Sequence, residues 1–357
     1  MPASQAFIKA KRCSNHNYII KKFILMKNIL LSIMVSLLFY NAYSQDYGLK
    51  NLDINLENYQ YPYPVKFIKV FDQLQELQMA YMDINPVNYN GKNVMLLHGK
   101  NFNGAYWRTT IAALSTAGFR VIVPDQVGFG KSSKPKTFQY TFQQLALNTK
   151  TLLDSLGINK ITVLGHSMGG MVAARFALMY PETTEKLVLE DPLGLEDWKL
   201  KVPYTSINST YEKQLESNYE SIKKYQVENY YHGTWKEEYD EWAKLLAGWT
   251  PNKNYKIIAW NSALTYDMIF TQPVCYEFQN ISCPTLLIIG TLDKTAIGKQ
   301  SVSEEVRKTM GDYKALGKIT RDKIPNATLV EIDNVGHLPH IEAFDQFIKP
   351  LLAFLQK

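Results

Sequence analysis

Short, continuous apolar runs separated by amphipathic stretches dominate the chain from residue 65 onward. Such runs are typical of parallel strands that helices cover on both faces, whereas half-exposed strands alternate apolar and polar positions. Two earlier runs, 67–70 and 78–82, predict an antiparallel pair at a sheet edge. The pattern therefore predicts an α/β chain with a mostly parallel sheet, whose further strands cover residues 93–97, 121–124, 161–164, 186–191, 283–290 and 327–332.

The run at 161–164 stops at the sequence Gly-His-Ser-Met-Gly, and a helical pattern then extends to about residue 180. A sharp strand-to-helix turn holds its serine, here Ser167, in a strained conformation with Oγ exposed. The positions two residues either side must lack bulk, which accounts for Gly165 and Gly169. The spacing alone fits an idle serine equally well. Ser167 is therefore a candidate nucleophile that needs partners elsewhere in the chain.

The composition changes between about residues 194 and 279, where no strand-like run occurs and helical patterns dense in Tyr and Trp appear. We predict a helical insertion here, with most aromatics packed against the rest of the chain and a minority lining a cleft. Residues 45–64 are polar and rich in Tyr and Pro, which predicts an irregular segment. An amphipathic helix is predicted near residues 341–355.

The first 44 residues carry six basic residues and no acidic residue, and 29–40 is almost wholly apolar. Lys27 before that run, and Ala42-Tyr43-Ser44 after it, form the pattern of a signal peptide cleaved after Ser44. A membrane span needs about 20 apolar residues, which disfavours an uncleaved anchor. We therefore predict a secreted or periplasmic protein without stable membrane insertion after cleavage.

Removing the leader changes the charge of the protein. The whole chain has 39 basic and 33 acidic residues, so without the six basic residues of 1–44 the net charge falls from +6 to zero. No global field then favours nucleic acid or an anionic membrane, and we predict a small-molecule substrate. Met26, followed by Lys-Asn, resembles a natural initiator, so residues 1–25 are interpreted as an upstream extension from a misplaced start. The oligomeric state stays open.

Cysteine placement predicts no metal centre. Cys275 and Cys283 lie eight positions apart outside the leader. In an exported protein they could pair, but Cys283 opens a predicted buried strand, so a disulfide and two free thiols both stay open. Neither has neighbours at metal-ligand spacing, and we expect no metal and no cofactor.

From about residue 65 to the C-terminus the chain resembles the α/β-hydrolase fold family. The resemblance rests on His98-Gly99 after one strand, on Asp125 with its glycines after the next, and on the Gly-His-Ser-Met-Gly turn. It implies a mostly parallel central sheet flanked by helices, with a helical cap inserted after the strand that follows the nucleophile. The expected organisation is a signal peptide at 1–44, an irregular segment at 45–64, core at 65–193, cap at 194–279 and core at 280–357.

The resemblance also assigns an oxyanion hole. In that family the residue after His-Gly and the residue after the nucleophile each supply a backbone N–H, here Lys100 and Met168. This sequence lacks the proline that many members have shortly after His-Gly. Asp125 and its glycines lack the spacing of a phosphate-binding loop, so we interpret them as a turn that holds the active-site loop. His98 is interpreted as a turn-stabilising residue.

Ser167, Asp293 and His337 follow the nucleophile–acid–base order of this fold, and each comes just after a predicted strand. Parallel strands place their carboxyl ends at one edge of a sheet, so these residues can converge. The histidine would take the serine proton, and the aspartate would orient the histidine. Asp293 and His337 could each be a capping or turn residue alone. Asp191 also follows a strand and is an alternative acid.

A serine nucleophile implies an acyl-enzyme, hence an ester, lactone, thioester or amide substrate. We predict an exported esterase for small or medium uncharged substrates. The alternatives are a carbon–carbon bond hydrolase of vinylogous diketones, whose relatives carry other residues at positions 166 and 338, and a peptidase or amidase of the same fold. A non-catalytic binding module is disfavoured by the intact triad.

Overall fold

The computed structural model describes residues 26–27 and 47–357 of the chain. The chain divides into a unit of residues 1–48 and a unit of residues 49–357, and the sheet with its helices lies in the second unit. The predicted signal peptide falls outside the described residues apart from Met26 and Lys27. No helix in the described ranges is long and apolar enough to cross a membrane.

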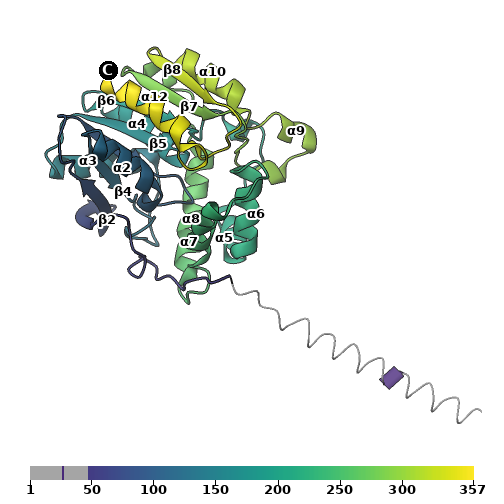
Figure 1. Cartoon of the computed structure of the whole chain (residues 1–357). Coiled ribbons are helices and arrows are strands. Elements are labelled where there is room, and N and C mark those ends of the chain that lie inside the picture. The colour runs from purple at the N-terminus through teal and green to yellow at the C-terminus, as the bar shows by residue number, and fades with distance from the viewer. Residues whose placement is uncertain (1–25, 28–46) are drawn as a thin grey trace, which may run out of the picture. The chain divides into compact units, whose positions relative to one another are not determined.

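The described residues form one eight-stranded sheet in the order β1-β2-β4-β3-β5-β6-β7-β8 (Figure 1). β2 pairs antiparallel with both β1 and β4, and every other neighbouring pair is parallel. The predicted mostly parallel α/β sheet is thus confirmed. The strands are β1 (Val65–Asp72), β2 (Gln75–Ile84), β3 (Asn93–Leu97), β4 (Arg120–Pro124), β5 (Ile161–His166), β6 (Thr184–Glu190), β7 (Thr285–Gly290) and β8 (Ala327–Ile332).

Helices cover both faces of this sheet. One face carries α3 (Phe142–Ser155), α4 (Met168–Met179) and α10 (Tyr313–Lys323), and the other carries α2 (Arg108–Thr116) and α12 (Phe344–Gln356). In β3, Met95 and Leu97 belong to the first core and Val94 and Leu96 to the second. All four are fully buried. Double-sided burial is the reason that the strands appear in the sequence as continuous apolar runs.

The insertion between β6 and β7 contains only helices and irregular segments in the described chain. α5 packs on α8, and α6 packs on α7. Figure 1 shows these helices gathered beside the sheet domain. We call residues 194–279 the cap; its main helices are α5 (Ile207–Leu215), α6 (Tyr219–Asn229), α7 (Asp240–Ala247) and α8 (Tyr255–Thr271), and its short 3-10 turns are η2 (Trp198–Leu200), η3 (Glu237–Tyr239) and η4 (Phe278–Asn280).

The remaining short elements are η1 (Gly104–Trp107), η5 (Lys299–Ser301), α9 (Glu304–Lys308) and α11 (Pro339–Glu342). The predicted last helix is in fact α11 followed by α12, because the non-helical backbone of Ala343, with φ −145° and ψ 55°, separates them. Cys275 and Cys283 are both buried and unpaired. Burial raises the pKa of each thiol.

Residues 49–64 are irregular, yet they are tied to two parts of the fold. The N–H of Leu52 donates to the carbonyl of Gly248 at 2.8 Å, and Trp249 Nε1 donates to the carbonyl of Asp53 at 2.9 Å. Closer to β1, Tyr61 Oη donates to a carboxylate oxygen of Asp125 at 2.7 Å. This segment therefore connects the cap with the loop after β4.

Candidate active site

Ser167 lies at the turn between β5 and α4 and has φ 57° and ψ −123°. This strained conformation is rare for a residue other than glycine. A Cβ at position 165 would lie 2.1 Å from the carbonyl oxygen of Gly169, and one at 169 would lie 2.2 Å from that of Leu97. No side chain fits at either position. The two glycines therefore allow the strand and the helix to approach closely enough for this turn.

The three residues expected to form the triad lie in one hydrogen-bonded chain. His337 Nε2 is 2.9 Å from Ser167 Oγ, and His337 Nδ1 is 2.7 Å from Asp293 Oδ2. The other carboxylate oxygen of Asp293 accepts from the N–H of Thr295 at 2.7 Å. All three triad side chains are buried. The loops after β5, β7 and β8 bring them together at one edge of the sheet.

Asp191, the alternative acid, has a different partner. Both of its carboxyl oxygens lie 3.1–3.2 Å from the N–H of Gly290, and neither is bonded to His337. Burial raises the pKa of Asp191 well above its usual range, and the charge of Asp293 adds to the effect. Asp293 is therefore the carboxylate that faces the histidine.

A second histidine holds the first in place, and the sequence did not predict this role. His166 Nε2 donates to the carbonyl of His337 at 2.7 Å. The other ring nitrogen accepts from Tyr106 Oη at 3.0 Å, and Tyr106 Oη in turn accepts from the N–H of Gly99 at 3.0 Å. Burial and the neighbouring His337 lower the pKa of His166 well below its usual range. His166 is thus a neutral positioning residue between the loop after β3 and the loop of His337.

The expected oxyanion-hole donors flank the nucleophile. Met168 is the first residue of α4, where helical N–H groups have no partner within the helix. A Cβ on Gly99, next to Lys100, would lie 3.1 Å from the Cβ of Ser167, so the two loops are in contact. In the described part of the chain, the backbone N–H groups of Lys100 and Met168 have no hydrogen-bond acceptor. Both remain available to an oxygen anion on the substrate.

His98 and Asp125 stabilise the loops around this site. His98 Nδ1 donates to the carbonyl of Gly99 at 2.9 Å, and Nε2 accepts from the N–H of Gln126 at 3.1 Å. The carboxylate of Asp125 accepts from the N–H groups of Gly104 and Lys131, both at 2.7 Å. These bonds all go to backbone groups of the neighbouring loops, which fits the interpretation of both as turn residues.

The cap reaches the catalytic histidine through Tyr230, just after α6. The ring of Tyr230 stacks on His337 with centroids 4.9 Å apart. Its carbonyl accepts from the N–H of His337 at 2.8 Å, and its hydroxyl accepts from Asn101 Nδ2 at 2.8 Å. One cap residue therefore contacts both the His337 loop and the loop after β3.

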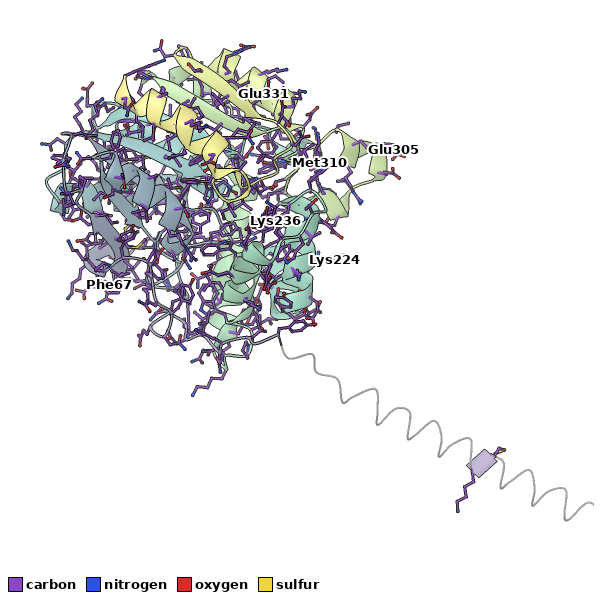
Figure 2. All side chains as sticks on the ribbon, in the orientation of Figure 1. Phe67, Lys224, Lys236, Glu305, Met310 and Glu331 are labelled. Atoms are coloured by element: carbon purple, nitrogen blue, oxygen red, sulfur yellow. The ribbon has the colours of Figure 1, made fainter. Side chains whose placement is uncertain are left out.

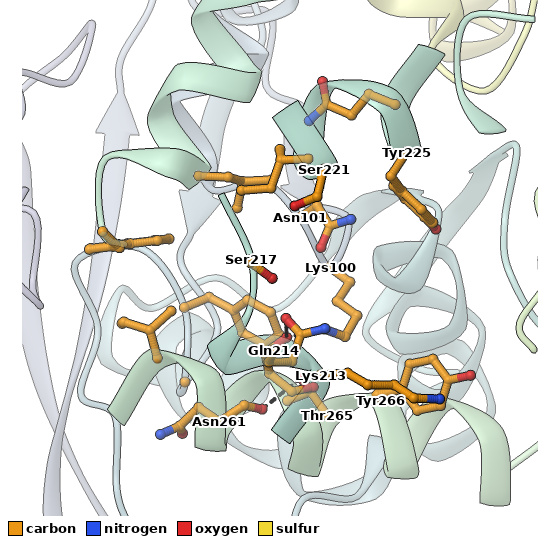
Figure 3. Close-up of a pocket in the computed structure, with 18 of the residues that line it drawn as sticks. Lys100, Asn101, Lys213, Gln214, Ser217, Ser221, Tyr225, Asn261, Thr265 and Tyr266 are labelled. Atoms are coloured by element: carbon orange, nitrogen blue, oxygen red, sulfur yellow. Dashed lines mark hydrogen bonds between the residues drawn. The ribbon is translucent and has the colours of Figure 1, made fainter. Parts of the chain in front are cut away.

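A cavity of about 440 Å³ lies beside Ser167, lined by side chains of the cap and the core (Figure 3). Its apolar lining includes Leu193, Ile222, Leu246, Ile258 and Ile297. No group of three or more His, Cys, Asp or Glu residues in the described ranges is arranged to hold a metal ion.

Comparisons with known proteins agree with this architecture. The family model for the alpha/beta hydrolase fold matches residues 92–344. A probable hydrolytic enzyme of Pseudomonas aeruginosa PAO1 has a similar crystal structure, with a TM-score of 0.85 and 49% identity, over 87% of this chain and 99% of that one. Lipase 1 of Psychrobacter immobilis is 28% identical over 275 residues, which cover 75% of this chain and 78% of that protein.

A shorter match concerns a different chemistry. The 2-hydroxy-6-oxo-6-phenylhexa-2,4-dienoate hydrolase of Burkholderia cepacia is 40% identical over 108 residues, which are 29% of this chain and 38% of that enzyme. The family model covers more than two thirds of the present sequence, and the sheet order and the strained serine turn agree with it. The chain belongs to the α/β-hydrolase fold family.

Proposed function

We propose that this chain is an exported serine hydrolase that cleaves a small or medium-sized carboxylic ester through an acyl-enzyme intermediate. The observation that carries the proposal is the chain of hydrogen bonds Ser167–His337–Asp293, with bonds of 2.9 and 2.7 Å. Carboxylic ester hydrolysis is further supported by the similarity to Lipase 1 of Psychrobacter immobilis. Export is proposed from the leader pattern alone.

In the proposed acylation step, His337 first accepts the serine proton and later gives it to the leaving alcohol. Ser167 Oγ attacks the ester carbonyl carbon while its proton passes to His337 Nε2, and the carbonyl oxygen becomes an anion. The N–H groups of Lys100 and Met168 stabilise that anion, at about 3 kcal/mol for each donor. Asp293 stabilises the imidazolium that forms. When the intermediate collapses, the carbon–oxygen bond to the alcohol breaks, and His337 Nε2 returns the proton to the leaving oxygen.

Deacylation repeats the sequence with water. His337 removes a proton from a water molecule that attacks the acyl carbon, and the proton then returns to Ser167 Oγ as the acid leaves. This requires the histidine to stay in one orientation through both steps. The bonds that His337 makes with Asp293, with His166 and with the carbonyl of Tyr230 supply that orientation.

The cavity supports the proposed substrate size. A volume of about 440 Å³ lies in the lower half of the usual range of ligand pockets, which favours small or medium-sized esters. Carbon–carbon bond hydrolysis of a vinylogous diketone is a second candidate, because of the local similarity to the Burkholderia enzyme. Both reactions would use the same three residues, and substrate tests separate them.

The test combines labelling with substrate panels. Ser167→Ala is expected to lose fluorophosphonate labelling and at least about a thousandfold in kcat, because the nucleophile is removed while the fold is kept. Ser282→Ala, on an exposed loop, is the matched control and keeps both. For the parent protein, kcat/KM over C2 to C16 4-nitrophenyl esters should peak at the short end.

Three outcomes would contradict parts of the proposal. Substantial activity of Ser167→Ala would remove the nucleophile assignment. A maximum at C12 or beyond would refute the size limit. Turnover of a vinylogous diketone in place of every ester would favour the second candidate.

A further inference from the structure

The side chain of Lys100 enters the cavity, whereas the proposed mechanism uses only its backbone. Lys100 Nζ donates to Ser262 Oγ at 2.7 Å, and Ser262 Oγ donates to Gln214 Oε1 at 3.1 Å. Ser262 belongs to α8 and Gln214 to α5, and both line the cavity. Figure 3 shows Lys100 and Gln214 among the lining side chains. The cap therefore holds the ammonium group at a defined place in the substrate cavity.

This ammonium has no counter-ion within the described residues. No carboxylate there lies within ion-pair distance of Lys100 Nζ, and the hydroxyl of Ser262 that it contacts is neutral. An ammonium carries three N–H donors, so further hydrogen-bonding capacity remains. Burial lowers the pKa of Lys100 to about 8, and no neighbouring acid opposes that shift. A cation in a cavity without an anion favours a ligand that brings one.

The lining has more basic than acidic side chains. Three lysines line the cavity, Lys100, Lys134 and Lys213, against one acidic residue, Glu216. Lys134 Nζ already donates to the carbonyls of Gly130 and Ser132, at 2.6 and 2.9 Å. Lys213 is exposed to solvent, where water satisfies its donors. Of the two less exposed cavity lysines, Lys100 therefore has the greater remaining donor capacity.

We propose that the substrate is an ester that also carries a carboxylate, and that Lys100 Nζ binds this carboxylate beside the reacting serine. This inference rests on the proposed function, since it specifies the ester that the same site takes. A lysine ammonium binds an anionic oxygen as a point charge through charge-assisted hydrogen bonds, and a carboxylate is the anion that a carboxylic ester substrate can carry. The proposal replaces the expectation of an uncharged substrate. That expectation came from the net charge of the chain, which does not describe the few residues around a cavity.

The test compares matched anionic and neutral esters. One pair places the charge in the acyl part: 4-nitrophenyl hydrogen glutarate against 4-nitrophenyl pentanoate. The other pair places it in the alcohol part: 4-carboxyphenyl acetate against phenyl acetate. The quantity measured is the ratio of kcat/KM for the anionic ester to kcat/KM for the neutral one. Comparing this ratio between variants cancels the intrinsic reactivity of the esters.

Lys100→Met is expected to lower that ratio about 10- to 100-fold for at least one pair, as expected for a lost hydrogen bond between charged groups. Lys100→Arg should restore a large part of it, because the charge is kept. The matched control is Lys224→Met, an exposed lysine of α6 outside the cavity (Figure 2), which leaves the ratio unchanged. A ratio within about twofold of the parent value for both pairs in Lys100→Met would overturn the inference.

A binding measurement separates this inference from the proposed function. Glutarate is titrated into Ser167→Ala and into the double variant Ser167→Ala/Lys100→Met, using calorimetry. We expect binding to weaken about 10- to 100-fold in the double variant. If the parent protein hydrolyses no ester while glutarate binding still depends on Lys100, the proposed function fails and the anion site stands. If esters are hydrolysed with unchanged ratios and glutarate does not bind, this inference alone fails.

Discussion

Asp293 and Asp191 follow neighbouring strands, yet only one of them faces the catalytic histidine. Asp293 Oδ2 lies 2.7 Å from His337 Nδ1, whereas Asp191 is bonded to the backbone of Gly290. We therefore predict that Asp293→Asn lowers kcat about ten-thousandfold, because the amide favours the wrong histidine tautomer. Asp191→Asn should lower kcat less than about tenfold, since Asp191 is bonded to the N–H of Gly290 and not to the histidine.

Steady-state kinetics with one short 4-nitrophenyl ester measures both variants. Melting curves of the two proteins provide the control for folding. The reverse order of the two kcat values would assign the acid to Asp191 and would show that the loop after β7 is only structural.

Lys134 gives a prediction about pH and stability. Burial lowers the pKa of its ammonium to about 7, while in the unfolded chain it keeps the ordinary value of about 10.4. Between these values the unfolded state binds more protons, so this group makes the protein more stable as pH rises through that window. Below pH 7 Lys134 is charged in both states, so its unfavourable contribution to the free energy of unfolding no longer changes with pH.

We therefore expect the Tm of the parent minus that of Lys134→Met to increase from pH 6.5 to pH 9.5. The absolute Tm of the variant also reflects the two lost bonds to Gly130 and Ser132, so the change with pH is the informative quantity. Lys224→Met, which removes an exposed ammonium, should give a constant difference. Parallel curves for parent and Lys134→Met would contradict the prediction.

At the scale of elements, the junction of β5 and α4 depends on close backbone contact. A Cβ at position 165 would lie 2.1 Å from the carbonyl of Gly169, so Gly165→Ala must push the helix away from the strand. We expect a loss of about 3 kcal/mol or more in the free energy of unfolding. Urea unfolding monitored by tryptophan fluorescence measures it.

Gly157→Ala is the matched comparison. Gly157 has φ 65° but open space around the position of a Cβ, so only conformational strain of about 1–2 kcal/mol applies. If the two variants lost the same stability, steric contact at the junction would not be the cause.

The strands could be predicted from the sequence because burial on both faces leaves a signal in consecutive residues. β3 was predicted with its observed bounds, and β7 begins two residues later than predicted because Pro284 precedes it. The cap was predicted only as helical, since its aromatic residues show no periodicity that fixes which helix packs on which. The individual helices of the cap were therefore not predicted. The core helix α10 was not predicted either.

For the candidate site, the triad could be predicted from the sequence, whereas the residues that position it could not. Ser167, Asp293 and His337 follow strand ends, which the topology brings together. The roles of His166 and Tyr230 depend on where a ring points and on which loop lies beside it. Residues 60 or more positions apart in sequence make those contacts, and no local pattern encodes them. The direction of the Lys100 side chain is likewise set by the cap helices rather than by its own neighbours.

At the scale of the whole molecule, charge separates the leader from the rest of the chain. All six basic residues of 1–44 lie in a segment without acidic residues, and the remainder is neutral overall. We predict that the mature protein begins at Gln45. Intact-mass and N-terminal analysis of protein isolated from the native host test this. Recovery of a soluble cytoplasmic form that retains residues 29–40 would contradict it.

Charge also differs between the whole molecule and its cavity. Outside the leader the basic and acidic residues balance, whereas three lysines and one glutamate line the cavity. Long-range attraction of an anionic substrate is therefore weak, and recognition takes place after entry. Selectivity of this kind should depend less on ionic strength than that of an exposed ion pair, because Lys100 is partly buried and a partly buried pair is less screened.

Through the bond between the carbonyl of Tyr230 and the N–H of His337, the cap helps to hold the catalytic base in position. Any displacement that carried the end of α6 outward would take away the acceptor of the histidine backbone and the ring stacked on its imidazole. The bonds of His337 to Asp293 and to the ring of His166 would remain, so the base would keep its tautomer and lose part of its support. Opening the cap would thus slow the attack of water on an acyl group carried by the serine, and hydrolysis would be fastest once the cap had closed again.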